Sequence, residues 1–571
     1  MPKWNGRRLG WTLALLAAMT LSPLAALAQD ASPVASAAIV SPTRAEWTAA
    51  YEAEMAFTEP STPGGTFIDS ATYDIQTVQP LLAEENNSIA VAGMMFEPLV
   101  GGDPRTGEPA PNALADFWEI APDRITYTFH LNRDARWHDG EPVTAADVIF
   151  SFDALANEKT GSVYTGTFNE SVASYRAIDD YTVEVVAKQP RVDFLYTNMM
   201  AAVVVPKHIW GDIPVEKWAT DPGATGQDPS RVVGSGPFKF QEWTPGESVT
   251  LVRNDDYYGK VAWIDTYVRR VWPDQIAVVN ALLNDELDVA GLEPADVAAI
   301  EGTPGIAIED FPTRNFSYLE FNLDPEVTTL FQDRDVRQAM MYAIDRQSIV
   351  DDILLGYAEV ARGTQPVISY AYAPEDTTPV YEFDPEKAKQ LLAAAGWTDS
   401  NGDGTVDKDG QELSFELLYP SGSPTSDQIA AYLQDAWKAV GVDAAPKSLE
   451  FPAMIEATTT DPSFAVALYG FQWDATFIQD AMFGCNQYQV GFNDMRYCNP
   501  DLDKINAQAV VAFDEAQRRA LLIQASNIVN EDLPVLVLDF GKSIVAYSDR
   551  VQNYAPNTWG GTPLTYLWLE Q

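Results

Sequence analysis

The stretch Ile-Thr-Tyr-Thr-Phe-His-Leu (residues 125–131), followed by Trp-His-Asp-Gly-Glu-Pro-Val-Thr-Ala-Ala-Asp-Val (residues 137–148), decides the fold class. In the first part apolar residues alternate strictly with polar ones, which predicts a half-buried β-strand. The second part predicts a turn and then a helix start, with Thr144 as the N-cap and Asp147 three residues on. A strand that passes through a turn into a helix is typical of a mixed α/β fold.

The same mixture of strands and helices continues on both sides of this stretch. Helices are predicted at residues 45–57, 335–355, 385–395 and 426–440, and buried strands at residues 413–419 and 464–469. The chain has 571 residues, which is more than one hydrophobic core usually supports. We therefore expect an α/β protein of two or three domains with several mixed sheets.

The charge of the chain excludes several classes of partner. There are 82 acidic and 36 basic residues, for a formal net charge of -46, while 46% of the residues are hydrophobic. The apolar content is too high for a disordered chain. A surface this acidic repels phosphate backbones and anionic lipid headgroups, so neither nucleic acid nor a membrane surface is expected as a partner.

The N-terminus has the pattern of a signal peptide. Lys3, Arg7 and Arg8 precede an apolar run over residues 9–27, and Ala-Leu-Ala at residues 26–28 predicts cleavage after residue 28. The alternative is an uncleaved membrane anchor. No cysteine lies near the cleavage site, so we expect no lipid anchor through an N-terminal Cys. The mature protein is expected on the periplasmic or extracellular side of the membrane.

The chain has two cysteines, Cys485 and Cys498. In an exported protein, two cysteines this close in sequence predict a local disulfide. Such a crosslink stabilises a fold by about 3 kcal/mol in the chain-entropy model. A nucleophilic or redox role is disfavoured because the C-terminal half contains no histidine, and a structural zinc site needs more ligands.

Short motifs in a fixed order indicate a family. They are Met-Phe-Glu-Pro-Leu-Val (95–100), Asp-Pro-Arg-Thr-Gly (103–107), Pro-Asn-Ala-Leu-Ala-Asp-Phe-Trp (111–118), the two segments quoted first, Gly-Ser-Gly-Pro-Phe-Lys-Phe (234–240), Asp-Val-Arg-Gln-Ala (335–339), Asp-Pro-Glu-Lys-Ala (384–388) and Ala-Gly-Trp (395–397). Together they resemble the extracellular solute-binding protein family 5, the peptide- and nickel-binding subunits of ABC importers. The resemblance covers about residues 64–555.

This resemblance implies a periplasmic-binding-protein type II-like fold, with two hinged lobes and an extra domain. The implied division is a signal peptide (1–28), a linker and short helix (29–59), a first lobe (60–92, 229–313 and 535–571), an extra domain inserted in it (93–228) and a second lobe (314–534). Residues 29–42, rich in Ala, Ser and Pro, predict a flexible linker. The ligand is expected between the lobes, which close around it.

The resemblance also implies how a peptide would be held. A cleft for peptides of varied sequence has to bind their backbone amides and charged ends. Tyr-Gly-Phe-Gln-Trp-Asp (469–474) resembles the family segment Gly-Trp-x-x-Asp, with Phe471 in place of the Trp. By this comparison Asp474 binds the α-ammonium, for about 1.5–3 kcal/mol, and the backbone of Gly470, Phe471, Gln472 and Trp473 pairs with the ligand. The alternative is that Asp474 only caps a local turn.

An acidic loop predicts a structural calcium ion far from the cleft. Asp399, Asn401, Asp403, Thr405 and Asp407 stand at the spacing of the first part of an EF-hand loop. Gly410 occupies the position where such loops carry a bidentate Glu, so a plain surface loop is the alternative. No other cofactor is expected.

Catalytic interpretations find little support in the sequence. The histidines are His130, His138 and His208, all in one region, and no catalytic triad is visible. His138 is expected to stabilise a turn, and Gly234 and Gly236 a tight backbone path. We therefore expect a monomeric, non-catalytic binding protein that passes a peptide to an ABC permease. The alternatives are another solute, namely a nickel chelate, an oligosaccharide or an opine, and a secreted acidic hydrolase.

Overall fold

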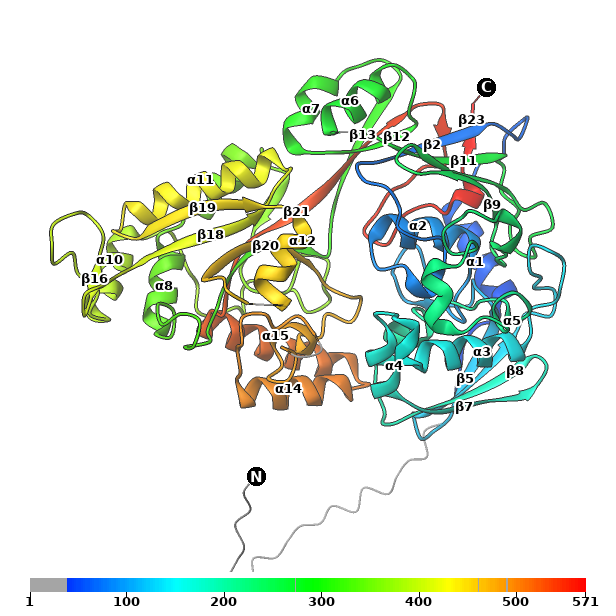
Figure 1. Cartoon of the computed structure of the whole chain (residues 1–571), viewed down its shortest axis with the longest axis horizontal. Helices are drawn as coiled ribbons and strands as arrows, with labels where there is room; N and C mark the ends of the chain where they lie inside the picture. Colours follow the sequence, from blue (N-terminus) through cyan, green and yellow to red (C-terminus); the bar gives the residue numbers. More distant parts are fainter. Residues whose placement is uncertain (1–37, 273, 461, 489–490, 571) are drawn as a thin grey trace, which may run out of the picture.

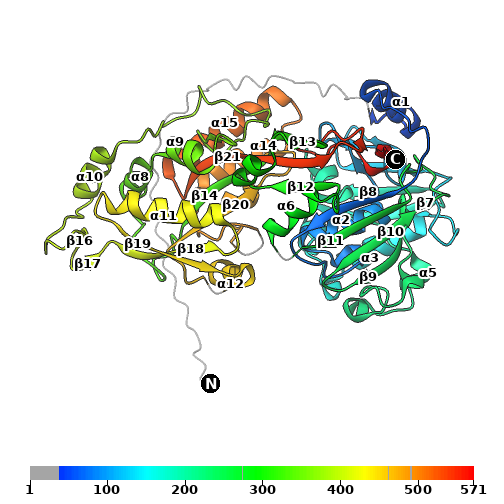
Figure 2. The ribbon, with the colours of Figure 1, turned by 90° about the horizontal axis from the view of Figure 1, so that it is seen from above.

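The computed structural model of the chain describes residues 38–272, 274–460, 462–488 and 491–570 (Figure 1). The predicted signal peptide and most of the predicted linker lie outside these residues. Among the described helices, none combines the length and the apolar character that a membrane crossing requires. The chain forms two halves, and one long sheet runs through both of them (Figures 1 and 2).

The long sheet is mixed and contains twelve strands in the described part. Its order is β19 (Asp443–Leu449), β18 (Ser414–Pro420), β20 (Val466–Gln472), β14 (Asn315–Phe321), β21 (Val535–Ser548), β12 (Val289–Leu292), β2 (Thr66–Ala71), β11 (Thr266–Val271), β10 (Ser248–Arg253) and β9 (Phe238–Thr244), while β13 (Ile306–Pro312) and β15 (Ala358–Val360) also pair with β21. Strand β21 belongs to both halves. Its residues 535–541 pair with β14 and β15, and its residues 542–548 pair with β12 and β13.

The chain therefore crosses between the halves at two adjacent places. One is the middle of β21, and the other is the short connection from β13 to β14. The sequence division places residue 535 at the start of the first lobe, whereas the crossing lies inside β21, because this strand completes a sheet in each half. We call the part with β2, β9, β10, β11 and β12 the first half, and the part with β14, β18, β19 and β20 the second half.

Helices cover the faces of the sheet in both halves. In the first half these are α2 (Asn86–Met95), α6 (Gln275–Leu283) and α7 (Pro294–Ile300), and in the second half they are α8 (Arg334–Tyr342), α9 (Arg346–Ser348), α10 (Pro385–Ala394), α11 (Pro424–Lys438), α12 (Phe451–Ile455), α13 (Asp480–Phe483), α14 (Pro500–Val510) and α15 (Glu515–Asp532). Short 3-10 turns lie at η1 (Pro80–Leu82), η2 (Glu158–Thr160), η4 (Val215–Thr220), η5 (Pro229–Arg231) and η8 (Leu564–Tyr566), and π-helical turns at η3 (Leu195–Met199), η6 (Ile349–Ile353) and η7 (Glu456–Thr460).

A five-stranded antiparallel sheet forms a separate layer of the first half. Its order is β1 (Ile39–Val40), β5 (Ala115–Ile120), β6 (Thr126–Leu131), β8 (Thr182–Ala187) and β7 (Val172–Asp179), and it packs with α3 (Ala145–Ala156), α4 (Thr165–Ser171) and α5 (Lys207–Trp210). Strand β6 and helix α3 confirm the elements predicted from residues 125–148. The predicted cap forms as well, since the backbone N–H and hydroxyl of Thr144 both donate to the Asp147 carboxylate at 2.9 Å.

The N-terminal segment is more ordered than the predicted flexible linker. Ile39 and Val40 form β1, which pairs with Ile120 and Glu119 of β5. Helix α1 (Arg44–Met55) follows, with Thr43 and Glu46 in a capping box. The linker prediction is wrong here because backbone hydrogen bonds to an open sheet edge hold this short segment, and such bonds leave no trace in its composition.

The helix predicted over residues 335–355 is broken in the structure. α8 ends at Tyr342, and Asp345 then starts α9 by accepting hydrogen bonds from the backbone N–H groups of Gln347 (3.1 Å) and Ser348 (3.3 Å). The buried Arg346 side chain donates to the carbonyls of Val537 (3.1 Å) and Tyr381 (2.8 Å). These tertiary bonds outweigh the helical periodicity of the segment. The helices predicted at 385–395 and 426–440 are confirmed as α10 and α11.

A tight crossing of backbones lies where His138 meets the Gly234–Gly236 turn. Nδ1 of His138 accepts from the Gly234 N–H, and Nε2 donates to the Gly236 carbonyl, both at 3.1 Å. Burial lowers the pKa of His138 to about 4, so the ring is neutral at pH 7. The structural role predicted for His138 is therefore confirmed. A Cβ on Gly234 would lie 1.9 Å from the Met95 carbonyl oxygen.

We predict that Gly234→Ala destabilises the protein, because the added methyl meets a backbone atom that cannot rotate away. Overpacking of this kind costs at least about 1–3 kcal/mol. Gly93→Ala on α2 is the matched control, since its Cβ would have open space and alanine favours a helix. Calorimetry should show a lower Tm for Gly234→Ala only. Equal Tm values for the two variants would contradict the close contact.

A second prediction concerns Asp539 on β21, which is 1% exposed and accepts a hydrogen bond from the Ser317 hydroxyl at 3.2 Å. Burial raises its pKa to about 7, against about 3.9 in an unfolded chain. Ionisation of Asp539 therefore costs more in the folded protein than in the unfolded chain. Its contribution to the free energy of unfolding is most favourable below pH 4 and is lost as the pH rises to 7. Asp539→Asn should gain stability relative to the native protein over this range, by up to about 4 kcal/mol.

Denaturant titrations at pH 4, 5.5 and 7 measure this difference. Asp435→Asn, on the exposed face of α11, is the control for the loss of one carboxyl group at the surface. A difference for Asp539→Asn that does not change with pH would show that folding does not raise the pKa of this carboxyl.

Candidate functional site

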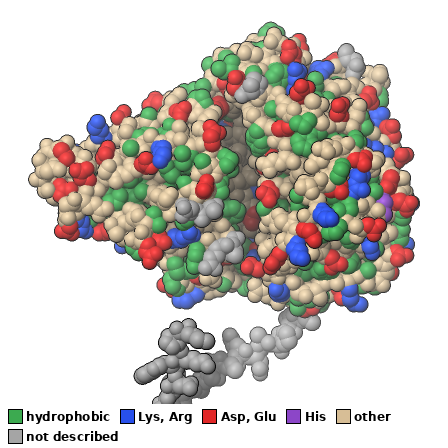
Figure 3. Space-filling model, viewed as in Figure 1, with side chains coloured by type: hydrophobic (Ala, Val, Ile, Leu, Met, Phe, Trp, Pro, Cys, Tyr) green, Lys and Arg blue, Asp and Glu red, His purple; other side chains and the backbone are tan. Residues whose placement is uncertain are grey.

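The groove between the two halves is the candidate site. Figure 3 shows it as a hollow that runs between them, with hydrophobic side chains along its rims. One pocket of about 540 Å³ lies where the chain crosses from one half to the other. Its lining includes Gln275 and Glu293 from the first half, Ser317 and Gly541 from the crossing strands, and Gly470 from β20.

Strand β20 has a free edge on this groove. On one side it pairs with β14 along its whole length, from Val466 to Gln472. On the other side β18 pairs only with Val466 and Ala467. In the described part of the chain, residues 468–472 therefore have no strand partner on that side. Next to Gly470 there is open space, since a Cβ there would meet only the Phe316 carbonyl oxygen, at 3.9 Å.

The predicted site residues 470–474 form the end of this strand and the turn after it. Gly470 and Gln472 are exposed, and Phe471 is half-buried. Trp473 is 2% exposed, and its indole N–H donates to the Thr364 carbonyl at 2.7 Å. The Trp473 side chain is thus part of the core, and only its backbone is available to a ligand.

Asp474 has two different carboxylate oxygens. Its Oδ1 accepts hydrogen bonds from the backbone N–H groups of Thr476 (2.8 Å) and Phe477 (3.2 Å) and from the Thr476 hydroxyl (2.6 Å). Within the residues that the structure describes, Oδ2 accepts none. The geometry of Oδ1 is that of the predicted turn cap, and the exposed side chain leaves Oδ2 for another partner.

The surroundings of Asp474 favour a positive ligand group. Loss of hydration among the enclosing protein atoms raises the pKa of Asp474, and the carboxylate of Asp193 adds to this effect, while the hydrogen bonds from Thr476 oppose it. Asp193 belongs to the first half, so the groove brings two carboxylates from opposite walls near one another. Asp193 is paired with Arg191 at 2.6 Å, so a bound cation would chiefly lower the cost of keeping Asp474 ionised.

Arg314, Tyr196 and Trp559 also lie near Asp474, and sequence reasoning did not identify them. Arg314 lies in the connection between β13 and β14, donates to the Trp473 carbonyl at 2.7 Å, and stacks 4.9 Å from the centre of the Trp559 ring. Tyr196 on η3 is close enough that the Asp474 charge, after burial, helps to raise the pKa of its hydroxyl. The four residues are far apart in sequence, so no local motif could have indicated the group.

The two halves touch at both ends of the groove. At one end the Val192 N–H donates to the Val510 carbonyl at 2.9 Å. At the other, the Thr425 hydroxyl donates to Glu293 at 2.9 Å. Aromatic contacts also join the halves: the Phe477 and Trp559 rings lie 6.5 Å apart, and Arg124 lies 5.4 Å from the centre of the Phe513 ring.

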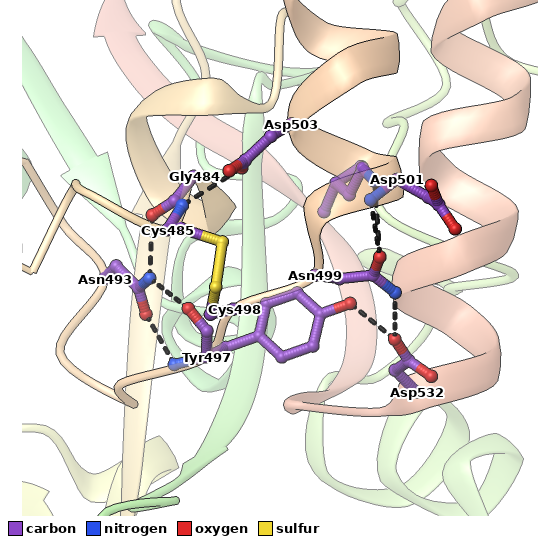
Figure 4. Close-up of a disulfide and its surroundings, with 10 residues drawn as sticks. Gly484, Cys485, Asn493, Tyr497, Cys498, Asn499, Asp501, Asp503 and Asp532 are labelled. Carbon is purple, nitrogen blue, oxygen red and sulfur yellow. Dashed lines mark hydrogen bonds between the residues drawn. A yellow bond between two sulfur atoms is a disulfide. The ribbon is translucent and has the colours of Figure 1, made fainter. Parts of the chain in front are cut away.

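The predicted disulfide between Cys485 and Cys498 is present. It closes a loop between α13 and α14, and Figure 4 shows the bond with its surroundings. Inside the loop the buried Asn493 side chain donates to the carbonyls of Gly484 (2.9 Å) and Tyr497 (2.6 Å) and accepts from the Tyr497 N–H (3.0 Å).

The acidic loop lies at the far end of the second half, next to the hairpin of β16 (Asp407–Lys408) and β17 (Gln411–Glu412) (Figure 1). Its carboxylates accept hydrogen bonds within the loop: Asp399 from the N–H groups of Gly402 (2.6 Å) and Gly404 (3.1 Å), and Asp403 from that of Thr405 (2.9 Å). The described residues contain no group of three or more His, Cys, Asp or Glu side chains arranged to hold a metal ion. Calcium binding there stays a prediction.

Comparisons with known proteins agree with this geometry. Residues 108–491 match the family described as bacterial extracellular solute-binding proteins, family 5 Middle. The oligopeptide-binding protein AppA of Bacillus subtilis (strain 168) is 28% identical over 494 residues, which cover 86% of this chain and 89% of AppA.

Solved structures show the same fold. AppA from Bacillus subtilis in complex with a nonapeptide has a TM-score of 0.80 and 27% identity, covering 89% of this chain and 100% of that one. NikZ from Campylobacter jejuni in complex with Ni(L-His) has a TM-score of 0.77 and 26% identity, covering 88% and 99%. The predicted fold class is confirmed, and the protein is a solute-binding component of transport and not an enzyme. This chain belongs to the bacterial extracellular solute-binding proteins, family 5.

Proposed function

We propose that this protein is the extracytoplasmic binding component of an ABC importer and that it captures peptides in the groove between its halves. The observation that carries the proposal is the free edge of β20, which ends at the Asp474 carboxylate. An edge of unpaired backbone groups beside a pocket is suited to an extended ligand that also has backbone groups to pair.

In the bound state the peptide lies antiparallel to β20, with its amino end at Asp474. The backbone of Gly470, Phe471, Gln472 and Trp473 supplies donors and acceptors along the ligand. Oδ2 of Asp474 accepts a charge-assisted hydrogen bond from the α-ammonium. Glycine at position 470 keeps the approach to the edge open, since no Cβ stands there.

Closure of the groove follows from the way the halves are joined. The crossings within β21 and between β13 and β14 allow rotation of one half against the other without breaking either sheet. Tyr196 and Asp193 from the first half then approach Asp474 from the opposite wall. Such closure encloses the ligand and excludes water from its charged end.

The cellular setting is part of the proposal. Residues 1–28 are proposed to direct export and to be removed, leaving a monomer on the periplasmic or extracellular side without a lipid anchor. An ABC permease is proposed to accept the loaded protein. The relative AppA, whose structure holds a nonapeptide, supports a peptide ligand, while NikZ with Ni(L-His) makes a nickel chelate the alternative to be tested.

We predict that short peptides with a free amino end raise the Tm, whereas sugars and nickel chelates do not. Asp474→Asn should weaken peptide binding by about 10- to 150-fold, the equivalent of a lost charge-assisted bond of 1.5–3 kcal/mol. Asparagine retains an oxygen for the turn that Oδ1 caps, so the local fold is preserved. Titration calorimetry measures the affinity.

N-acetylated peptides are the control for this prediction. They lack the ammonium, so they should bind the native protein and Asp474→Asn with equal, weak affinity. If sugars or chelates shift the Tm and peptides do not, the peptide assignment fails. If Asp474→Asn binds free and acetylated peptides as the native protein does, the role of Asp474 fails.

A structural calcium ion in the loop of residues 399–410 is a separate proposal. It rests on the spacing of Asp399, Asn401 and Asp403, whose oxygens would have to leave their present partners in the loop. Millimolar calcium should raise the Tm, a chelator should reverse the shift, and Asp403→Ala should abolish it. An unchanged Tm would leave the loop as a turn held by its own hydrogen bonds.

A further inference from the structure

Phe492 is an exposed aromatic residue next to the end of β20. It is 58% exposed, although the residue that follows it is buried. One side of the ring contacts Phe471 of β20, with ring centres 5.4 Å apart at an angle of 73°. Phe471 in turn packs against Trp473 and Phe316 at 5.0 and 5.8 Å. The two phenylalanines therefore form an apolar surface that is anchored in the core and open on one side.

The loop that carries Phe492 is held in place by covalent and polar bonds. The disulfide joins its two ends, and Asn493, the residue after Phe492, is fully buried. The Asn493 side chain bonds Gly484 and Tyr497 (Figure 4). The Phe492 N–H donates to the Ala481 carbonyl at 2.9 Å. A side chain on so constrained a backbone loses little conformational freedom when a ligand packs against it.

The loop packs on the face of the sheet that carries Tyr469 and Phe471 of β20. Asp494 accepts a hydrogen bond from the Thr459 hydroxyl at 3.0 Å, and the neighbouring Thr458 bonds the Tyr469 hydroxyl at 2.8 Å. Both threonines follow α12, whose Met454 packs on Leu418 of β18. Met495 of the same loop shares an apolar cluster with Phe316 and Tyr318 of β14, and its carbonyl accepts from the Leu323 N–H at 2.9 Å. The loop therefore covers the face of β14 and β20 on which Phe471 lies.

The period of a β-strand then determines which ligand groups meet this surface. Tyr469, Phe471 and Trp473 point to one face of the sheet and Gly470 and Gln472 to the other, since side chains alternate along a strand. A ligand that pairs with the edge places every second side chain on the face of Phe471. A ligand residue directly opposite a residue of β20 has its Cβ about 5 Å from the Cβ of that residue. With the amino end at Asp474, that position falls within about the first three ligand residues, because both strands rise by about 3.4 Å per residue.

We propose that Phe471 and Phe492 form an apolar subsite that selects peptides with a large hydrophobic side chain near the amino end. This inference rests on the proposed peptide-binding function and adds a side-chain preference to it. The disulfide loop is the element that positions Phe492, so the crosslink supports ligand selection as well as stability.

The test uses pentapeptides with a free amino end that contain serine throughout, or leucine at position 1, 2 or 3. Calorimetry with the native protein should show one leucine peptide bound roughly tenfold more tightly than the all-serine peptide, as expected for one aliphatic side chain removed from water. Phe492→Ala should abolish this ratio and leave the affinity for the all-serine peptide unchanged. Phe492→Leu should retain most of it.

Phe383→Ala is the matched control. Phe383 is 51% exposed, in the same half, and lines a separate pocket with Arg346 and Tyr381. Its removal should change neither affinity. A double Cys485→Ser, Cys498→Ser variant tests the crosslink, and should reduce the leucine preference while the all-serine peptide still binds.

The outcomes separate this inference from the proposed function. If all peptides bind but leucine gives no advantage at any position, or if the advantage survives Phe492→Ala, the subsite is refuted and peptide binding stands. If the double serine variant keeps the full leucine preference, the role of the disulfide loop is refuted. If no peptide binds the native protein, the subsite and the proposed function fail together.

Discussion

The hydrogen bonding of β21 into both halves of the molecule is the constraint on which the rest of the structure depends. One continuous strand, Val535–Ser548, supplies an inner strand to the sheet of each half, and the connection from β13 to β14 runs beside it. Neither half can complete its sheet without this strand. Their relative movement is therefore limited to what β21 and the connection from β13 to β14 can accommodate where they pass from one half to the other.

The groove shelters a strand edge of the second half. On an open surface the same edge would favour aggregation. Exposed edges with unpaired backbone groups invite pairing with other chains. Here β18 diverges from β20 after Ala467, and the opposite wall, with Tyr196 and Asp193, faces the opening. In the function proposed above, the same backbone groups that would cause association elsewhere bind an extended peptide.

Sequence reasoning succeeded where short-range interactions decide the structure. The alternation of residues 125–131 predicted β6, the Thr144–Asp147 spacing predicted the start of α3, and the two cysteines predicted their bond. It failed where contacts with residues distant in sequence determine the local structure. The buried Arg346 breaks a helix by reaching carbonyls of other elements, and β1 forms only because β5 offers an edge. For the site, residues 470–474 came from a family motif, whereas Arg314, Tyr196 and Trp559 meet Asp474 only once both halves have folded.

The pairing of β1 with β5 has a consequence for the order of assembly. Ile39 and Val40 are made before the residues 119–120 that they pair with, and before the α3 layer that supports β5. Until those residues have been made, Ile39 and Val40 have no strand to pair with, so they join the sheet only after β5 is available. Any tag or fusion joined just ahead of residue 38 is therefore attached to an edge strand that pairs after its partner has been made.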